Sequence, residues 1–277
     1  MGSITLAPPI DRTCLFLPEH LTHLYYAPVY RRLTAAQRLR YNQLFACYFN
    51  EQTIFFETRL VRYLARFAPT LAGDERRHAA MYQALNERAE PDLYRRRTFY
   101  FISTPPAASA ALDAATRLPR LFPLFAWLIL LQEERALFYA REIVARRDRL
   151  EPQFVEVNRR HMEDEEHHVT AGLALIDEVW EDTPALVRRL NARLFAWLVG
   201  EFFNAPKRAG IAVARRLAEE FADLDLPLLA AELRSLSASR AFHEAQYSRR
   251  IVPRTFARLD RCPEFDGLGR VLWGYAR

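Results

Sequence analysis

The sequence has 277 residues, of which 51% are apolar, enough to build the core of one large domain or two small ones. Its charged fraction of 26% is ordinary for a folded protein and argues against a disordered chain. Glycine is scarce and the net charge of +5 is spread along the chain, so the composition favours helices over sheets and gives little support for nucleic-acid binding.

The N-terminal residues 1–33 are punctuated by four prolines and are expected to form an extended arm. Residues 1–11 do not show the leader pattern of basic residues followed by an apolar stretch. The cysteines Cys14, Cys47 and Cys262 are odd in number and widely spaced, which indicates neither a disulfide framework nor a Cys-x-x-Cys metal site. We therefore expect a cytoplasmic protein.

Helical patterns fill most of the remaining chain. Thr34 can cap a first helix. The helices are expected at 34–66, 69–90, 119–147, about 152–180, 184–203, 206–223 and 226–249, with mostly connection at 91–118 and an irregular tail from 253. The most apolar run, 121–131, is too short to cross a membrane. The sequence thus predicts an all-α protein with an arm at 1–33, a single domain at 34–250 and a C-terminal tail at 251–277.

Two segments share the pattern Asp-Glu-x-x-His on predicted helices, at 74–78 and 164–168. Glu and His at positions i and i+3 lie on one face of a helix, so both can reach one metal ion. Two such motifs, each on its own helical hairpin, are typical of the carboxylate–histidine site of ferritin-like four-helix bundles. The alternative is that both motifs lie on solvated faces and form surface ion pairs.

The other two helices of the bundle should each supply a glutamate at the height of a motif. Glu57 lies about as far from the expected turn at Phe67-Ala68 as Glu75 and His78 do on the other side. Glu51 is the rival, but it would need a turn inside an unbroken helical pattern. In the second hairpin, the turn at 150 places the motif of residues 164–168 opposite a pair of glutamates, 133 and 134, and this geometry does not choose between them.

A further histidine extends the second motif. His161, Glu165 and His168 follow one another at i, i+4 and i+7, which forms one stripe along a helix. A ferritin-like site does not need this third residue, and its imidazole would make one metal richer in nitrogen ligands. Asp74 and Asp164 are placed to accept the N–H of a metal-bound imidazole across the bundle.

The stretches 48–57, 74–78 and 161–168 resemble the p-aminobenzoate N-oxygenase family of di-iron oxygenases. The hallmark of that family is an extra histidine ligand in His-x-x-x-Glu-x-x-His, which matches residues 161–168. The resemblance covers roughly residues 40–180, and the segment between the first two glutamates of the site is shorter than expected for the family, so the pocket is expected to differ. It implies Glu57 rather than Glu51, and Glu134 rather than Glu133. The implied metal ligands are Glu57, Glu75, His78, Glu134, His161, Glu165 and His168.

The resemblance implies two iron ions as cofactor, with O2 as co-substrate; oxygen and imidazole ligands with open positions suit iron or manganese better than zinc. It further implies N-oxygenation of a small-molecule amine to hydroxylamine, nitroso or nitro products in natural-product biosynthesis. An external electron donor is expected, because the chain shows no flavin or iron–sulfur motif. We expect neither a nucleic-acid nor a membrane partner, and a homodimer is an open option.

Two other functions compete with this expectation. The same site could hydroxylate or desaturate carbon, and only the products distinguish the two reactions. The chain could instead be a non-catalytic iron-binding bundle. His161 argues against this second alternative, because a storage centre should release its iron and a nitrogen-rich site should hold it.

Overall fold

The computed structural model describes residues 9–67, 69–203 and 208–276. Within these residues the regular structure is helical, and the β contact found there is an isolated bridge between Leu15 and Leu150. The α-helices are α1 (Ala35–Leu64), α2 (Pro69–Ala89), α3 (Pro91–Tyr94), α4 (Pro106–Ala115), α5 (Leu124–Ala145), α6 (Pro152–Trp180), α7 (Ala185–Leu198), α8 (Ala209–Glu220), α9 (Leu226–Ser235), α10 (Arg240–Gln246) and α11 (Pro253–Leu259). The prediction of an all-α fold is confirmed.

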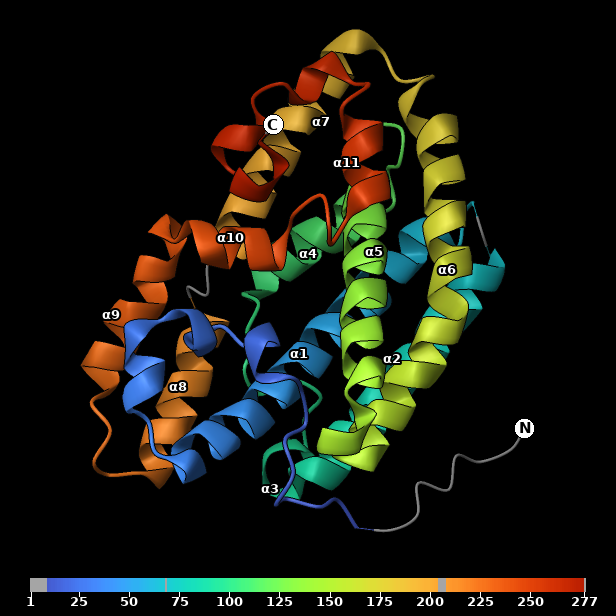
Figure 1. The fold of residues 1–277 in the computed structure, drawn as a ribbon. Coiled ribbons are helices and arrows are strands. Elements are labelled where there is room, and N and C mark those ends of the chain that lie inside the picture. Colours follow the sequence, from blue (N-terminus) through green and yellow to red (C-terminus); the bar gives the residue numbers. More distant parts are fainter. Residues whose placement is uncertain (1–8, 68, 204–207, 277) are drawn as a thin grey trace.

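Four long helices form the central bundle. Helices α1 and α2 pack as one antiparallel hairpin and α5 and α6 as a second, and the two hairpins meet through contacts of α2 with α6 and of α1 with α5 (Figure 1). Helix α8 packs on α1 at one end of the molecule and α9 packs on α8, whereas α7 and α11 pack against α5 at the other end. The bundle therefore has an interior that four helices can line.

Local capping explains where two of these helices begin. The Thr34 hydroxyl accepts a hydrogen bond from the Gln37 amide at 3.2 Å, and the Gln37 side chain accepts one from the Thr34 amide at 2.8 Å. This reciprocal pair is a capping box, and it confirms Thr34 as the cap of α1. The Glu151 carboxylate accepts from the amides of Gln153 and Phe154 and caps α6 in the same way.

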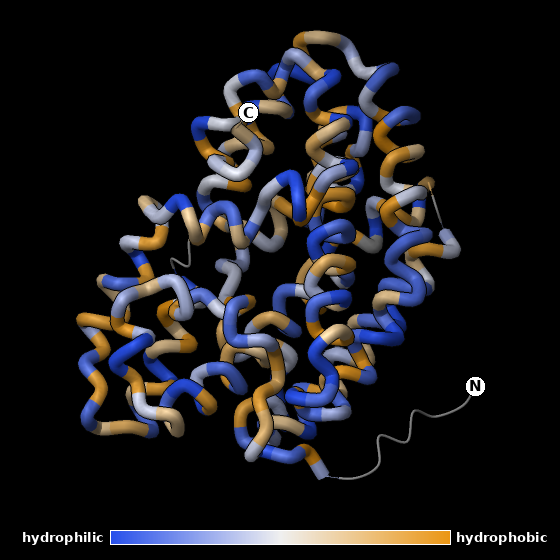
Figure 2. Tube along the Cα trace, viewed as in Figure 1, coloured by the Kyte–Doolittle hydropathy of each residue, from blue (hydrophilic) through white to orange (hydrophobic). Residues whose placement is uncertain are grey.

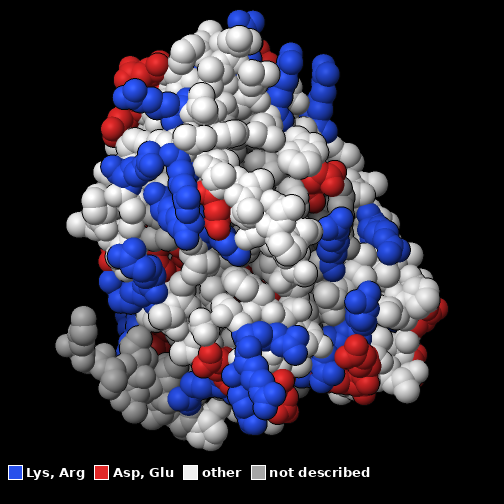
Figure 3. All heavy atoms as spheres, turned by 180° about the vertical axis from the view of Figure 1, so that it is seen from behind, with Lys and Arg blue, Asp and Glu red and all other residues white. Residues whose placement is uncertain are grey.

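Hydrophilic and hydrophobic residues are mixed along most of the helices (Figure 2), and the longest apolar stretch of α5 is its first eight residues. Among the described residues, no helix is long and apolar enough to cross a membrane. On the face shown in Figure 3, Lys and Arg side chains lie in separate groups with acidic and uncharged residues between them. The face thus carries no single continuous basic band.

The N-terminal arm and the C-terminal tail differ from the predictions. From residue 9 onward, the arm forms short 3₁₀ turns and buries apolar side chains such as Phe16 and Leu24, both 0% exposed. Residues 1–8 of the predicted arm lie outside the described part. The tail forms α11 and further 3₁₀ turns, with Phe256 and Leu272 also 0% exposed. The predictions for both segments failed because prolines and glycines indicate turns in the backbone. They do not indicate whether the apolar side chains between those turns are buried.

Smaller differences concern helix boundaries. The third predicted helix begins at α5, five residues later than expected, and the connection at 91–118 contains α3 and α4. The helix predicted at 226–249 is divided into α9 and α10, because a 3₁₀ turn intervenes and Ser239 caps α10 through the Phe242 amide. The helix predicted at 206–223 corresponds to α8, and the first two residues of that prediction, 206 and 207, lie outside the described part of the chain.

Candidate metal centre

Seven side chains from the four bundle helices meet in one buried cluster, referred to below as the seven-residue cluster. Its members are Glu57 of α1, Glu75 and His78 of α2, Glu133 of α5, and His161, Glu165 and His168 of α6. Glu133 is the most exposed, with 13% of its side chain accessible, and the others are at most 6% exposed. The helical spacings within α2 and α6 place their members on one inward face.

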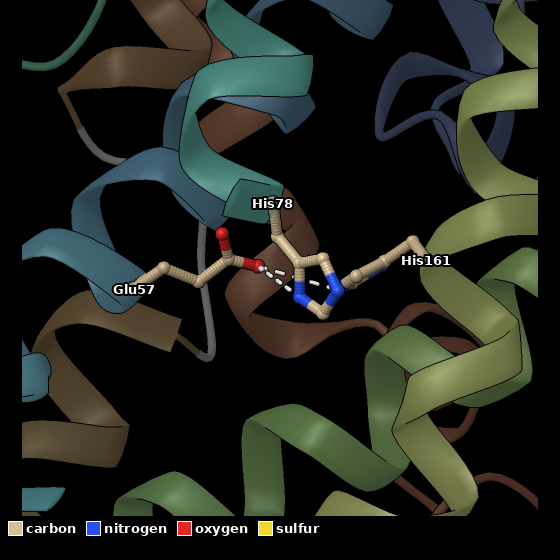
Figure 4. Close-up of side chains that lie close together, drawn as sticks. All are labelled: Glu57, His78 and His161. Carbon is tan, nitrogen blue, oxygen red and sulfur yellow. Dashed lines mark ion pairs between the residues drawn. The ribbon is translucent and has the colours of Figure 1, made fainter. Parts of the chain in front are cut away.

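One half of the seven-residue cluster joins α1, α2 and α6 (Figure 4). The Nε2 atom of His161 lies 3.2 Å from Oε1 of Glu57 and 2.6 Å from Oε1 of Glu165. The Nδ1 atom of His78 lies 4.0 Å from Oε1 of Glu57 and 3.8 Å from Oε1 of Glu165. Two imidazole nitrogens and two carboxylate oxygens thus converge on a space the size of one ion.

The other half joins α2, α5 and α6. The Nδ1 atom of His168 lies 3.4 Å from Oε1 of Glu75 and 3.8 Å from Oε2 of Glu133. It also lies 3.6 Å from Oε1 of Glu165. Because the same Glu165 oxygen approaches the histidines of both halves, this carboxylate stands between two neighbouring ion-sized spaces.

Several carboxylate and imidazole atoms of the cluster are buried without hydrogen-bond partners. They are Oε2 of Glu57, both carboxylate oxygens of Glu165, Nδ1 of His78, Nε2 of His161 and Nδ1 of His168. Buried polar atoms are nearly always satisfied, and leaving several orphaned in one place is costly. The donor set of carboxylate oxygens and imidazole nitrogens is the one that ferritin-like bundles use for paired iron or manganese. The residues therefore fit a pair of metal ions.

The electrostatics of the seven-residue cluster also favour a bound cation. Burial, and then repulsion by Glu75 and Glu165, raises the pKa of Glu57 well above its usual range. Burial, followed by repulsion from Glu165, raises the pKa of Glu133 to about 8. Burial lowers the pKa of His78 to about 4. The Glu133 and Glu165 carboxylates, by contrast, outweigh burial at His168 and raise the pKa of this imidazole to about 11. A cation that enters the cluster would take the place of that proton and would stabilise the ionised carboxylates.

The two aspartates of the motifs lie behind the histidines, as expected. Oδ2 of Asp164 lies 2.9 Å from Nε2 of His78, and Oδ2 of Asp74 lies 3.6 Å from Nε2 of His168. Arg77 donates to both aspartates, at 2.8 Å each. Asp164 is therefore within hydrogen-bond distance of His78, whereas Asp74 only approaches His168, and Nδ1 of both histidines faces the cluster.

Glu134 does not belong to the cluster, and the expectation that favoured it over Glu133 requires correction. Its carboxylate accepts from the amides of Arg254 and Thr255 at 2.8 Å each, and from the Thr255 hydroxyl at 2.8 Å. Glu134 thus caps the N-terminus of α11, on the other side of α5. Glu133 takes the inward position because successive helical residues point about 100° apart.

Glu51 also lies outside the cluster. It is 0% exposed and accepts hydrogen bonds from the Tyr94 hydroxyl and from the backbone amides of residues 100–102, at 2.7–3.0 Å. These donors hold the connection after α3 against α1. Glu51 is therefore satisfied by the protein, in contrast to Glu57.

Three further side chains near the cluster were not identified from the sequence. Tyr82 and Asn158 form hydrogen bonds behind His161, and Arg135 is buried on α5. The position of Tyr82, four residues after His78, places it on the inward face of α2 and was a usable signal. Arg135 follows Glu133 by two positions, a spacing that does not place two side chains on one face of a helix, so no sequence signal pointed to it.

Comparison with known proteins identifies the family. The family model described as p-aminobenzoate N-oxygenase AurF matches residues 7–225 of the 277. The chain belongs to this family. No curated protein and no solved structure matched the chain.

Membership of the p-aminobenzoate N-oxygenase family confirms the resemblance seen in the sequence and the ferritin-like fold class. The family consists of di-iron oxygenases, so the chain is an oxygenase by family, and its carboxylate–histidine groups are of a kind that could hold metal ions. The match ends before α10 and α11, so α11, the helix that Glu134 caps, lies outside it.

Two cavities flank Glu133 in this N-oxygenase family member. The larger, with a volume of about 210 Å³, lies between the α1–α2 hairpin and α5–α6, with Glu75, Glu133 and His168 on one side. Its remaining lining is mostly apolar, including Leu64, Phe67, Leu71, Ile129, Gly172 and Leu175. The smaller, about 30 Å³, is lined by Glu57, Glu133 and His161 together with Gln52, Phe56 and Arg135. Both cavities reach the seven-residue cluster.

Proposed function

We propose that this chain is a di-iron N-oxygenase that uses O2 to oxidise the nitrogen of a small-molecule amine in natural-product biosynthesis. The observation that carries the proposal is the set of orphaned, inward-facing carboxylate and imidazole atoms of the seven-residue cluster. Two divalent cations would balance the charge of its four glutamates. The third histidine, His161, supports an oxygenase over an iron store, because it adds a strong nitrogen donor to one half.

The residues divide the task of holding the ions. Glu57, His78 and His161 would hold one ion, and Glu75, Glu133 and His168 the other, with Glu165 reaching both. When bound, the iron pair supplies the electrons and open coordination sites with which O2 is reduced. The protein holds the ligands in place and keeps water away, since six of the seven residues are at most 6% exposed. Conversion of an amine to a hydroxylamine consumes one O2, two electrons and two protons, so an external electron donor completes the reaction.

We further propose that the amine substrate carries an anionic group. The guanidinium of Arg135 lines the smaller cavity, is 7% exposed, and has a buried Nε without a hydrogen-bond partner. Its contacts are uncharged: Tyr139 and Gln246 accept from Nη2 at 3.1 and 2.9 Å. Among the described residues, no carboxylate lies within ion-pair distance of it. A buried charge without a counter-charge is costly, and a substrate carboxylate would supply one. The compound in the family name, p-aminobenzoate, combines a carboxylate with an amine.

The test is oxygenation by the purified protein. Ferrous protein is supplied with a reductant, ¹⁸O2 and a panel of aromatic and aliphatic amines, and products are identified by mass. We expect ¹⁸O bound to nitrogen in at least one product, and about two tightly held irons per chain. Glu57→Ala is the matched inactive control. Oxygen found on carbon would indicate the hydroxylase alternative, and labile iron without any product would indicate an iron-binding bundle.

A further inference from the structure

Tyr82 lies directly behind His161, on the side away from the cluster. Its hydroxyl oxygen is 3.0 Å from Nδ1 of His161 and 3.1 Å from Oδ1 of Asn158. All three residues are at most 2% exposed. The contacts therefore form in a water-poor interior, where each proton must have a defined place.

The orientation of the Asn158 amide decides where the Tyr82 proton lies. Nδ2 of Asn158 donates to the backbone carbonyl of Phe154 at 2.8 Å, so Oδ1 is the atom that faces Tyr82. An amide oxygen can only accept, so the Tyr82 hydroxyl donates to Asn158. That hydroxyl has a single proton, and its oxygen is left to accept from Nδ1–H of His161.

This arrangement fixes the tautomer of His161. With the proton on Nδ1, the lone pair of the neutral ring is on Nε2, which faces the oxygens of Glu57 and Glu165 at 3.2 and 2.6 Å. His78 is turned the opposite way, because its Nε2 faces Asp164 and its Nδ1 faces the cluster. The two histidines of one half thus offer different ring nitrogens.

We propose that Tyr82 and Asn158 are positioning residues that hold His161 in the Nδ1–H tautomer, so that Nε2 is its metal-binding atom. The acceptor behind His161 is a neutral phenol, whereas the acceptor behind His78 is a carboxylate. A carboxylate makes an imidazole a stronger donor than a neutral acceptor does. The orientation of His161 therefore depends on two uncharged hydrogen bonds. This inference rests on the proposed function in one respect, namely that the metal bound in the cluster is iron.

The direct test is ¹⁵N NMR of the histidine rings in the zinc-loaded wild-type protein. We expect His161 bound through Nε2 with a proton on Nδ1, and His78 bound through Nδ1. The Nδ1 proton of His161 is also expected in the metal-free protein, so the assignment can be judged even if zinc does not bind. A His161 ring without a proton on Nδ1 would overturn the inference.

Variants test the role of the pair. Tyr82→Phe removes only the hydroxyl and should weaken binding of one of the two zinc ions by about 10- to 100-fold, leaving the other unchanged. Asn158→Leu should weaken the same ion, and Asn158→Asp, which keeps an acceptor for Tyr82, should preserve it. Tyr41→Phe is the matched control, because its buried hydroxyl accepts from the Leu24 amide at 3.0 Å, away from the cluster. Unchanged binding in Tyr82→Phe, or equal weakening of both ions, would contradict the inference.

Neither O2 nor an amine enters these measurements. A protein that binds zinc as described but forms no N-oxygenated product would contradict the proposed function and leave the positioning role intact. Conversely, if the wild-type protein is an active N-oxygenase but Tyr82→Phe binds both ions normally, the proposed function stands and the positioning role is contradicted.

Discussion

Oδ2 of Asp164 lies 2.9 Å from Nε2 of His78, although the two residues belong to different copies of the Asp-Glu-x-x-His motif. Asp74 approaches His168 in the reverse direction at 3.6 Å, and Arg77 connects the two aspartates. The internal duplication of the sequence thus has a structural meaning. Each motif contributes side chains to the cluster and places its aspartate beside the histidine of the other motif, within hydrogen-bond distance in the case of Asp164. The two hairpins are joined at the height of the metal centre.

The first prediction concerns this acceptor. Asp164→Asn keeps an oxygen that can accept from His78 but removes its charge, which lowers the donor strength of the imidazole. We expect metal affinity at one of the two ions to fall by about 10- to 100-fold, measured by competition with a chelator. Asp177→Asn is the control, because Asp177 lies on the same helix and pairs with Arg258 on the surface. Equal affinities in the two variants would exclude a role for Asp164 in ligand orientation.

The second prediction separates two adjacent glutamates. Glu133→Ala should lose one metal ion per chain, because its carboxylate faces His168 in the cluster. Glu134→Ala should keep both ions and lower the free energy of unfolding by about 1–2 kcal/mol, since it removes the cap of α11. Metal analysis and denaturant unfolding of both variants give the answer. Metal loss in Glu134→Ala with full metal content in Glu133→Ala would restore the assignment implied by the family resemblance.

These two glutamates also show how much of the site could be predicted from the sequence. Reflection about the turn before Pro152 pointed to the height on α5 at which Glu133 lies near Glu165 and His168, because the two helices of a hairpin rise at the same rate. It could not choose between Glu133 and Glu134, since a difference of about 100° in direction depends on how α5 is rotated about its axis. That rotation depends on how α5 packs against α6 and its other neighbours, among them α11, a segment expected to be irregular. The spacing carried over from the family pointed to Glu134, which the structure places at the start of α11 and not in the cluster.

The residues of α2 and α6 were easier to anticipate. Their members repeat at helical spacing within one element, so the sequence alone places Glu75 with His78, and His161 with Glu165. Arg135 and Asn158 depend on contacts between elements far apart in the chain, such as Arg135 with Gln246 on α10. No local pattern records such contacts, and so these residues emerged only from the structure.

The third prediction compares Glu57 with Glu51. Glu57→Ala should lose metal, because the carboxylate faces His78 and His161 and has an orphaned buried oxygen. Glu51→Ala should keep metal but destabilise the fold by at least about 3 kcal/mol, because several buried donors lose their acceptor together. Limited proteolysis should then cleave the connection around residues 95–105 faster than in the wild type. The reverse pattern of metal loss would overturn the placement of Glu57 in the cluster.

The fourth prediction concerns the third histidine. His161→Ala should leave a folded bundle, because the residue contributes little to the apolar core, but should impair the reaction with O2. The measurement is the optical transient after rapid mixing of the ferrous protein with O2, with circular dichroism as the check on folding. His20→Ala is a suitable control, since His20 pairs with Glu142 away from the cluster. An unchanged transient in His161→Ala would exclude His161 as a ligand.

The fifth prediction tests the anionic substrate through Arg135. Arg135→Met keeps the aliphatic length of the side chain and removes its charge. The zinc-loaded protein is titrated by calorimetry with matched pairs of amines that differ only in a carboxylate or a neutral amide. For the carboxylate member, we expect the Kd to rise at least about 10-fold in Arg135→Met, because a charge-assisted hydrogen bond is lost. The Kd of the neutral member should change little.

The thermal stability of Arg135→Met gives an independent test of the same proposal. If Arg135 serves substrate binding, the free protein carries a buried charge without a counter-charge, and replacement by Met should leave the Tm unchanged or raise it. If its contacts with Tyr139 and Gln246 serve the fold, the Tm should fall and both amines should bind as before. Arg141→Met is the control for charge, because Arg141 lies on the same helix and pairs with Glu166 on the surface. A lower Tm together with equal affinities for the two amines would therefore assign Arg135 to the core and remove the argument for an anionic substrate.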